Sequence, residues 1–304
     1  MLILNSLFPV VVLILLGFFL KRSGLTDTIF LQTSDKLVYY IFFPLMLFWK
    51  IGGSSYENGI NWDLCLAVLA ALLVMFLLSF VFILVFRISD YQAGSFAQSC
   101  YRFNTYMGVA IILNSLGEEG IRYFGVLIGI AIPIINVVAI TTLIWYSQEK
   151  LQQKNRGRLV MRALLSNPLI IGCLIGIIYS RSFNGFPDFI DNSLSLISML
   201  TLPLALLSIG GTLTFAGIRQ HIPLSLLAAL TKLILFPLIG FLFLRLFGVS
   251  GTAFQVGMIF FALPTSTAIY VLSSQMHSDA SLASSTILVS TLLSFPVLTF
   301  ILLL

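Results

Sequence analysis

Charged side chains are scarce in this sequence of 304 residues. Asp, Glu, Lys and Arg make up 9% of it, whereas hydrophobic residues make up 59%. A soluble domain carries roughly 25% charged residues, so lipid rather than water has to cover most of this surface. The composition predicts an all-α integral membrane protein, whose apolar segments leave no room for a soluble catalytic or DNA-binding domain.

Cysteine pairs and enzyme motifs are also missing. The three cysteines, Cys65, Cys100 and Cys173, lie in apolar runs without CxxC or Cys/His spacing, so we expect free thiols with no disulfide or metal role. The motifs GxSxG, HExxH and GxxxxGK[ST] do not occur. We therefore expect no catalytic residue, no metal and no cofactor, and the chain is predicted not to be an enzyme.

Acidic residues are absent from the middle of every apolar run. Proton and sodium carriers often use a carboxylate inside the membrane, and none is visible here. Coupling to H⁺ or Na⁺ stays open, with Glu118, Asp279 and His277 as candidates near helix ends. The carboxylates that fall near the ends of runs are Asp63, Asp90, Glu118, Glu119 and Asp279.

Ten long apolar runs are separated by turn-forming or charged stretches. A helix of about 20 apolar residues crosses the hydrocarbon core, and runs of this length in lipid must be helices because lipid offers no hydrogen bonds. The first run begins at Met1 and no cleavage site follows a basic region, so we expect a retained first span. The predicted spans are 2–20, 34–52, 62–86, 92–116, 121–147, 163–181, 193–217, 222–247, 251–276 and 280–304.

The second half of the chain repeats the first. The one clearly polar linker is basic and lies near the middle of the chain. A shift of about 159 positions aligns Gly17 with Gly176, and further matches follow in order. The sequence therefore predicts a first five-helix repeat at 1–148, a basic cytoplasmic linker at 149–162 and a second repeat at 163–304.

An odd number of spans in each repeat inverts the second repeat relative to the first. Inverted repeats are a recurring plan of secondary transporters. If the N-terminus is outside, the cytoplasmic loops hold ten Lys and Arg residues and the opposite loops hold four. The positive-inside rule then places both termini outside the cytoplasm of a multi-pass cell-membrane protein. The net charge of +5 has the same explanation and predicts no nucleic-acid partner.

Segments 4 and 9, in matching places of the two repeats, are the least regular. Pro264 removes a backbone donor, so segment 9 should break there, and Asn104, Thr105, Thr265 and Ser266 can satisfy the backbone groups that breaks release. Paired broken helices are a pointer to a midplane binding site. We therefore expect these residues to bind substrate at broken, crossing helices. The alternative for segment 9 is a simple proline kink, and the alternative for segment 4, where Asn104 is not a proline, is a continuous helix.

Two cations lie inside predicted spans. Arg102 and Lys232 each cost about 2.5–3.5 kcal/mol at the bilayer centre, so lipid exposure of either is not expected. A positive interior suits an anionic substrate, and Asn136 could line the same polar path. The alternatives are snorkelling for Arg102, a lysine bonded to carbonyls of a broken helix for Lys232, and a helix-packing hydrogen bond for Asn136.

Four stretches together resemble the auxin efflux carrier family. They are LGFFLKRSGL at 16–25, VYYIFFPLMLF at 38–48, NTYMGV at 104–109 and ALPT at 262–265. The resemblance implies a scaffold of helices 1, 2, 6 and 7, a transport domain of helices 3–5 and 8–10, an elevator movement and a homodimer formed through the scaffold.

In that family the crossed breaks hold a carboxylate, which maps here onto Asn104 and Pro264, and Asn136 falls where helix 5 often has a polar residue. This chain departs from the plant members by having Phe103 in place of a proline and by its short linker. It therefore resembles a prokaryotic carrier of small organic acids rather than of auxin.

The predicted function is an elevator-type secondary transporter of a small organic anion, a monoanion or dicarboxylate. Its expected partners are that anion, membrane lipid and a second copy of the chain. Two alternatives remain. A sodium-coupled symporter of the bile-acid type would share the inverted plan, and a membrane sensor would bind its ligand without moving it.

Overall fold

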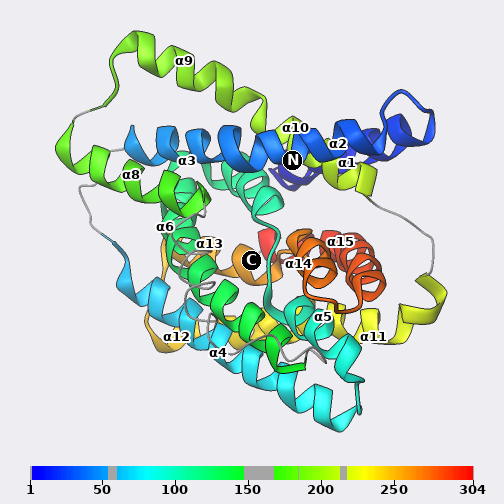
Figure 1. Cartoon of the computed structure of the whole chain (residues 1–304). Helices are drawn as coiled ribbons and strands as arrows, with labels where there is room; N and C mark the ends of the chain where they lie inside the picture. Colours follow the sequence, from blue (N-terminus) through cyan, green and yellow to red (C-terminus); the bar gives the residue numbers. More distant parts are fainter. Residues whose placement is uncertain (1, 54–59, 147–167, 184, 213–217, 304) are drawn as a thin grey trace, which may run out of the picture. The chain divides into compact units, whose positions relative to one another are not determined.

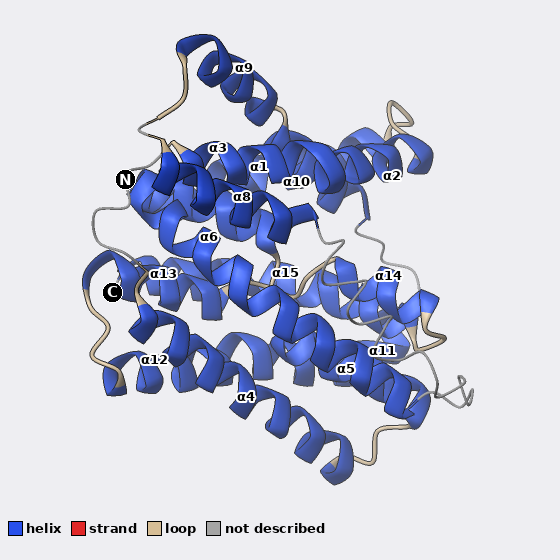
Figure 2. Ribbon diagram, turned by 60° about the vertical axis from the view of Figure 1, so that its left-hand side comes forward, coloured by secondary structure: helices blue, strands red, loops and turns tan. Residues whose placement is uncertain are grey.

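The computed structural model describes residues 2–53, 60–146, 168–183, 185–212 and 218–303, so the predicted linker at 149–162 lies outside the described part. Figure 2 shows helices and loops, with no strand among the described residues. The helices are α1 (Leu2–Arg22), α2 (Thr28–Leu37), α3 (Phe43–Gly52), α4 (Trp62–Val85), α5 (Asp90–Tyr101), α6 (Thr105–Tyr146), α8 (Pro168–Ser182), α9 (Asp188–Met199), α10 (Thr201–Thr212), α11 (Ile218–Leu230), α12 (Phe236–Leu246), α13 (Gly251–Ala262), α14 (Ala268–Gln275) and α15 (Ala280–Leu303).

The chain forms two compact units, and each unit takes residues from both halves of the sequence. Helix α6 contributes to both units. Unit 1 contains Met1–Asn61, Val109–Ile132 and Ala163–Leu213. Unit 2 contains Trp62–Gly108, Pro133–Arg162 and Thr214–Leu304.

In unit 1, α1 lies beside α10 and α3 lies beside α8 (Figure 1). Glycine allows the first pair to approach closely, because a Cβ at Gly17 would overlap the carbonyl oxygen of Leu207. In the second pair, a Cβ at Gly176 would lie 3.3 Å from the carbonyl oxygen of Phe48. Gly17 and Gly176, and likewise Phe48 and Leu207, are separated by the 159 positions of the sequence repeat.

Two π turns interrupt otherwise regular helices, at Val38–Phe42 before α3 and at Thr231–Leu235 before α12. Each is followed by a Phe-Pro pair, Phe43-Pro44 or Phe236-Pro237. A proline ring clashes with the carbonyl four residues before it, and a wider turn relieves that clash. The second π turn carries Lys232, one of the predicted site residues.

At the predicted boundary between segments 4 and 5, α6 has a kink at a single residue. Gly117 has φ 64° and ψ −151°, a conformation open to glycine alone, so two helices meet there without a loop. The side chain of Glu118, next in sequence, forms an ion pair of 2.7 Å with Lys50.

The helices of unit 2 carry the breaks expected in segments 4 and 9. Helix α4 packs on α12, α11 packs on α15, and α5 contacts α11, α14 and α15. By length and composition, five helical stretches of the described part could cross a membrane, and two shorter apolar helices accompany them. The all-α membrane class is confirmed, and the count of ten spans remains a prediction. The five long stretches are Trp62–Val85, Asp90–Tyr146, Asp188–Gly211, Gln220–Leu246 and Ala280–Leu303.

Candidate functional site

Unit 2 contains two interrupted helices of matching construction. Helix α5 ends at Tyr101 and α6 begins at Thr105, while α13 ends at Ala262 and α14 begins at Ala268. Helices α5 and α13 both have 12 residues, and their ends are 161 positions apart in sequence. Segment 4 is therefore broken just before Thr105, and segment 9 has an interruption of several residues rather than a simple kink.

The backbone leaves both helices in the same extended conformation. Arg102 has φ −71° and ψ 138°, and Leu263 has φ −62° and ψ 141°. Leu263 precedes Pro264, and a following proline disfavours the helical region. Arg102 precedes Phe103, so proline cannot explain the first break, and its cause has to be found in contacts with other elements.

Those contacts join the two breaks to one another. The backbone N–H of Asn104 donates to the carbonyl oxygen of Pro264 at 2.8 Å, and the hydroxyl of Thr265 donates to the carbonyl oxygen of Ser99 at 3.0 Å. The ring of Phe103 packs on that of Phe260 with centroids 4.3 Å apart. The carbonyls of Pro264 and Ser99 thus each accept a hydrogen bond from a residue of the other break. The contact between the two rings adds packing at this place, which we call the crossing of the breaks.

Asn104 begins the helix that follows the first break. Its side chain is 1% exposed, and its Oδ1 accepts a hydrogen bond of 3.1 Å from the N–H of Met107, as an N-cap residue does. Its Nδ2 group has no hydrogen-bond partner among the described residues. A buried amide donor without a partner costs about 1–3 kcal/mol, and the described residues leave this cost in place at Asn104.

The structure brings Arg102 and Asn136 together. The guanidinium Nη2 donates to Oδ1 of Asn136 at 3.0 Å, and Nη1 donates to Oε1 of Gln98 at 3.3 Å. Arg102 is half-buried. Its guanidinium is therefore oriented within unit 2 by the side-chain amide oxygens of Gln98 and Asn136.

Lys232 lies at the second break and is fully buried. Its Nζ donates to the carbonyl oxygen of Phe261 at 3.0 Å and lies 4.4 Å from the ring centre of Phe236. Phe261 is the penultimate residue of α13. The lysine thus bonds a carbonyl of the broken helix, which was one of its two predicted roles.

Thr105 and Ser266 occupy the starts of the second half-helices. Thr105 is the first residue of α6 and is half-buried. Ser266 precedes α14, and its hydroxyl oxygen accepts a hydrogen bond of 3.3 Å from the N–H of Ala268. The side chain of Ser266 is thus part of the start of α14, and a role in substrate binding remains a prediction for both residues.

A carboxylate considered for ion coupling lies at the other end of α5. Asp279 is 4% exposed, and its Oδ1 accepts from the N–H of Leu282 at 2.9 Å at the start of α15. Its Oδ2 accepts from Gln92 at 3.3 Å and lies 3.8 Å from Nδ1 of His221. No group of three or more His, Cys, Asp or Glu side chains suited to a metal ion occurs in the described ranges.

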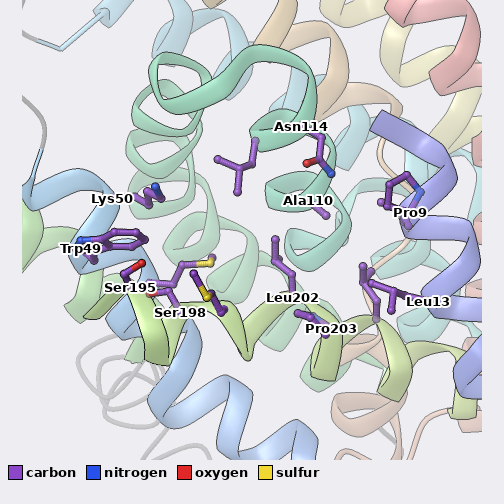
Figure 3. A pocket seen from close by; sticks show the side chains of 15 residues that line it. Pro9, Leu13, Trp49, Lys50, Ala110, Asn114, Ser195, Ser198, Leu202 and Pro203 are labelled. Carbon is purple, nitrogen blue, oxygen red and sulfur yellow. The ribbon is translucent and has the colours of Figure 1, made fainter. Parts of the chain in front are cut away.

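Unit 1 contains a cavity of about 340 Å³ (Figure 3). Trp49 and Lys50 lie at one end of it and Pro9 and Leu13 at the other. The indole N–H of Trp49 donates to Oδ1 of Asp191 at 2.7 Å, and this hydrogen bond holds the Trp49 side chain in place at its end of the cavity. Most of the lining is apolar. The lining residues are Pro9, Val10, Leu13, Met46, Trp49, Lys50, Ala110, Leu113, Asn114, Ser195, Ser198, Met199, Leu202, Pro203 and Leu206.

Sequence reasoning missed three residues that hold the breaks. Ser99 supplies the acceptor for Thr265, Ser290 accepts a hydrogen bond of 3.2 Å from the N–H of Thr265, and Phe260 packs on Phe103. Ser99 acts through its backbone carbonyl, which carries no side-chain signal, and the hydroxyl of Ser290 also donates to the carbonyl of Ile287 in its own helix, as serine in a helix often does. The cavity of unit 1 was missed as well, because its lining comes from five helices far apart in sequence.

Comparison with known proteins gives matches along almost the whole chain. Residues 2–302 match the model of a family described as membrane transport protein. An uncharacterized transporter of Methanocaldococcus jannaschii is 24% identical over 296 residues, covering 95% of this chain and 94% of the relative. An uncharacterized transporter of Methanothermobacter thermautotrophicus is 25% identical over 299 residues, with the same two coverages.

Proposed function

The chain belongs to the membrane transport protein family, that of the auxin efflux carriers, and we propose that it moves a small organic anion across the cell membrane. It is a multi-pass membrane transporter and not an enzyme. The substrate we infer is a carboxylate, either a monoanion or a dicarboxylate.

The observation that carries this proposal is the unpartnered amide of Asn104 beside the hydrogen bond that joins the two breaks. Helix α6 begins at Thr105, directly after that amide. The N-terminus of a helix carries about half a positive charge and presents N–H groups that have no helical acceptor. A carboxylate bound at this place would accept from Nδ2 of Asn104 and gain from the helix end.

Arg102 supports an anionic rather than a neutral substrate. Its guanidinium lies in the first break and is oriented by the amides of Gln98 and Asn136. An arginine side chain stays protonated in proteins, and its charge-assisted hydrogen bonds to carboxylates are among the strong ones. We assign Arg102 the long-range attraction and Asn104 the direct hydrogen bond, with Thr265, Ser266 and Pro264 forming the opposite wall.

The proposed movement is of the elevator type, in which the helices that bear the breaks travel together. The crossing contacts support this reading, because they join α5 and α13 through backbone groups at both breaks. Parts that are hydrogen-bonded in this way move as one body more readily than they slide apart. A homodimer formed through the remaining helices would supply the stationary part.

The test uses purified protein in liposomes and a panel of labelled organic acids. Asn104→Asp keeps an N-cap oxygen for Met107, since Asp caps helices as well as Asn does, but it replaces the amide donor with a negative charge. We expect anion uptake to fall by at least about tenfold, the effect of losing roughly 1.4 kcal/mol of binding, with an unchanged melting temperature. Asn192→Asp, the same change at an exposed position of α9, is the control.

Three outcomes would overturn the proposal. Uptake of neutral or cationic solutes alone would refute the charge argument. Uptake that requires Na⁺ and stops when K⁺ replaces it would favour the bile-acid symporter type. Binding of an acid without any flux would favour a sensor.

A further inference from the structure

The last backbone carbonyls of α13 do not have the N–H donors that a continuing helix would provide. In an unbroken helix the carbonyl of Phe260 would accept from residue 264 and that of Phe261 from residue 265. Pro264 has no N–H, and the N–H of Thr265 donates instead to the hydroxyl of Ser290 at 3.2 Å. The break thus leaves the partial negative charge of a helix C-terminus inside a membrane protein.

Lys232 supplies the missing donor. Its Nζ lies 3.0 Å from the carbonyl oxygen of Phe261, and its side chain is fully buried. A cation at a helix C-terminus interacts favourably with the helix dipole, most strongly in partly buried geometries. The ring of Phe236, whose centre is 4.4 Å from Nζ, adds a second favourable contact for an ammonium group.

Lys232 is part of an irregular turn that sets the direction of its side chain. Lys232 lies in the π turn Thr231–Leu235, which is closed by a hydrogen bond from the N–H of Phe236 to the carbonyl of Thr231. A π turn rotates the residues on either side of it relative to a regular helix, and such turns are frequent at functional sites. Without the extra residue of this turn, the side chain at position 232 would leave the helix in another direction.

We propose that Lys232 is a built-in counter-cation of the second break, which occupies the place where a soluble cation such as Na⁺ would otherwise neutralise the end of α13. In transporters with broken helices, unwound carbonyls and the C-terminal ends of half-helices coordinate the coupling cation. Here the ammonium of Lys232 holds one of those carbonyls permanently. Transport through this chain therefore requires no Na⁺ at this break, and Lys232 acts as a positioning residue for the crossing.

At the first break, the half-helix α5 ends at Tyr101, and the next residue, Arg102, is also a cation. Its guanidinium donates to the side chains of Gln98 and Asn136, whereas the ammonium of Lys232 donates to a backbone carbonyl of α13, so the neutralisation of a helix end is proposed for Lys232. The function of this arrangement rests on the proposed role of the breaks as the transport site, whereas the neutralisation itself can be measured without any substrate.

The first experiment uses the wild-type protein in detergent. Binding of ²²Na⁺ and the melting temperature are measured in NaCl and in choline chloride of equal ionic strength. The proposal predicts no bound ²²Na⁺ and equal melting temperatures. Saturable ²²Na⁺ binding, or stabilisation by Na⁺ over choline, would show that a soluble cation is still used and would overturn the proposal.

The second experiment removes the ammonium group of Lys232 by mutation and adds a small soluble ammonium compound in its place. Lys232→Ala is expected to lower the melting temperature by several degrees, and n-propylammonium, which matches the deleted atoms, should restore part of the loss. Tetramethylammonium, which has the charge but no N–H donor, and n-propanol, which has similar size but no charge, should not. Lys36→Ala, at an exposed lysine of α2, controls for the loss of one positive charge.

A Lys232→Ala protein that melts like the wild type, or that responds equally to propanol and propylammonium, would show a packing role only and would overturn the proposal. If Lys232→Ala does not fold, Lys232→Met keeps the volume and is compared with Lys232→Arg, which keeps the charge. Only the latter should keep the wild-type melting temperature. Failure to transport any anion would remove the proposed function and leave these stability results unaffected.

Discussion

The two breaks of unit 2 have the same geometry and different causes. At the second break, Pro264 follows Leu263 and disfavours the helical conformation there, so the local sequence favours the break in addition to its contacts. At the first break, Arg102 has nearly the same dihedral angles, yet it is followed by Phe103. The first break is fixed by its contacts with the second, namely the Asn104 N–H on the Pro264 carbonyl and the Phe103 ring on Phe260.

A helix inside a membrane can therefore be broken without a local helix breaker, provided that another element forms hydrogen bonds with the released backbone groups. Every backbone polar group in lipid must be satisfied within the protein. The second break releases the carbonyl of Pro264, and the first break supplies the N–H of Asn104 that binds it. The two interruptions therefore stabilise each other, and each is weakened when the other is altered.

The largest effect on stability is expected at Phe103. It is 4% exposed and its ring centre is 4.3 Å from that of Phe260. Phe103→Ala should lower the free energy of unfolding by about 3 kcal/mol because a large buried ring is lost, and Phe103→Leu should lower it by less. Thermal unfolding in detergent measures both. Phe300→Ala, at a residue 61% exposed on α15, is the control, and an equal loss there would contradict the assigned role.

A smaller effect is expected at Thr265, whose hydroxyl ties the second break to α5. Thr265→Val deletes the hydroxyl and keeps the shape of the side chain. The loss should be about 1 kcal/mol, the usual net value of one hydrogen bond, measured as a fall in melting temperature. Thr265→Ser, which keeps the donor to Ser99, should lose less. If serine and valine are equally destabilising, the methyl group and not the bond to Ser99 is what matters.

The smallest effect is expected at Pro264, although it is the most conspicuous residue of the site in the sequence. Pro264→Ala restores an N–H but leaves the carbonyl that accepts from Asn104 and the Lys232 contact with Phe261. The break should persist, with a change of at most about 1 kcal/mol and with anion uptake retained. A fall in stability as large as that of Phe103→Ala would mean that proline, and not the crossing contacts, holds this break.

The proline break and the cation positions could be read from the sequence because each depends on one residue type. Pro264 lacks an N–H wherever it lies in a helix, and Arg102 and Lys232 cannot face lipid at low cost. The break before Asn104 was also expected, from its matching place in the repeat. The partners of these residues could not be read, because Ser99, Phe260, Phe261 and Ser290 are ordinary residues of apolar helices.

The membrane class and the helical content follow from the amino-acid sequence alone, because burial in lipid depends on composition and on the length of apolar runs. The family could be recognised from short sequence motifs. The partner of each polar group, in contrast, follows from the packing of the helices. Lys232 lies in a π turn and reaches the carbonyl of Phe261, whereas Asn104 binds Pro264 through its backbone N–H, caps α6 through its Oδ1 and leaves its Nδ2 without a partner among the described residues. Such hydrogen bonds depend on distances between helices, and no run of residues specifies those distances alone.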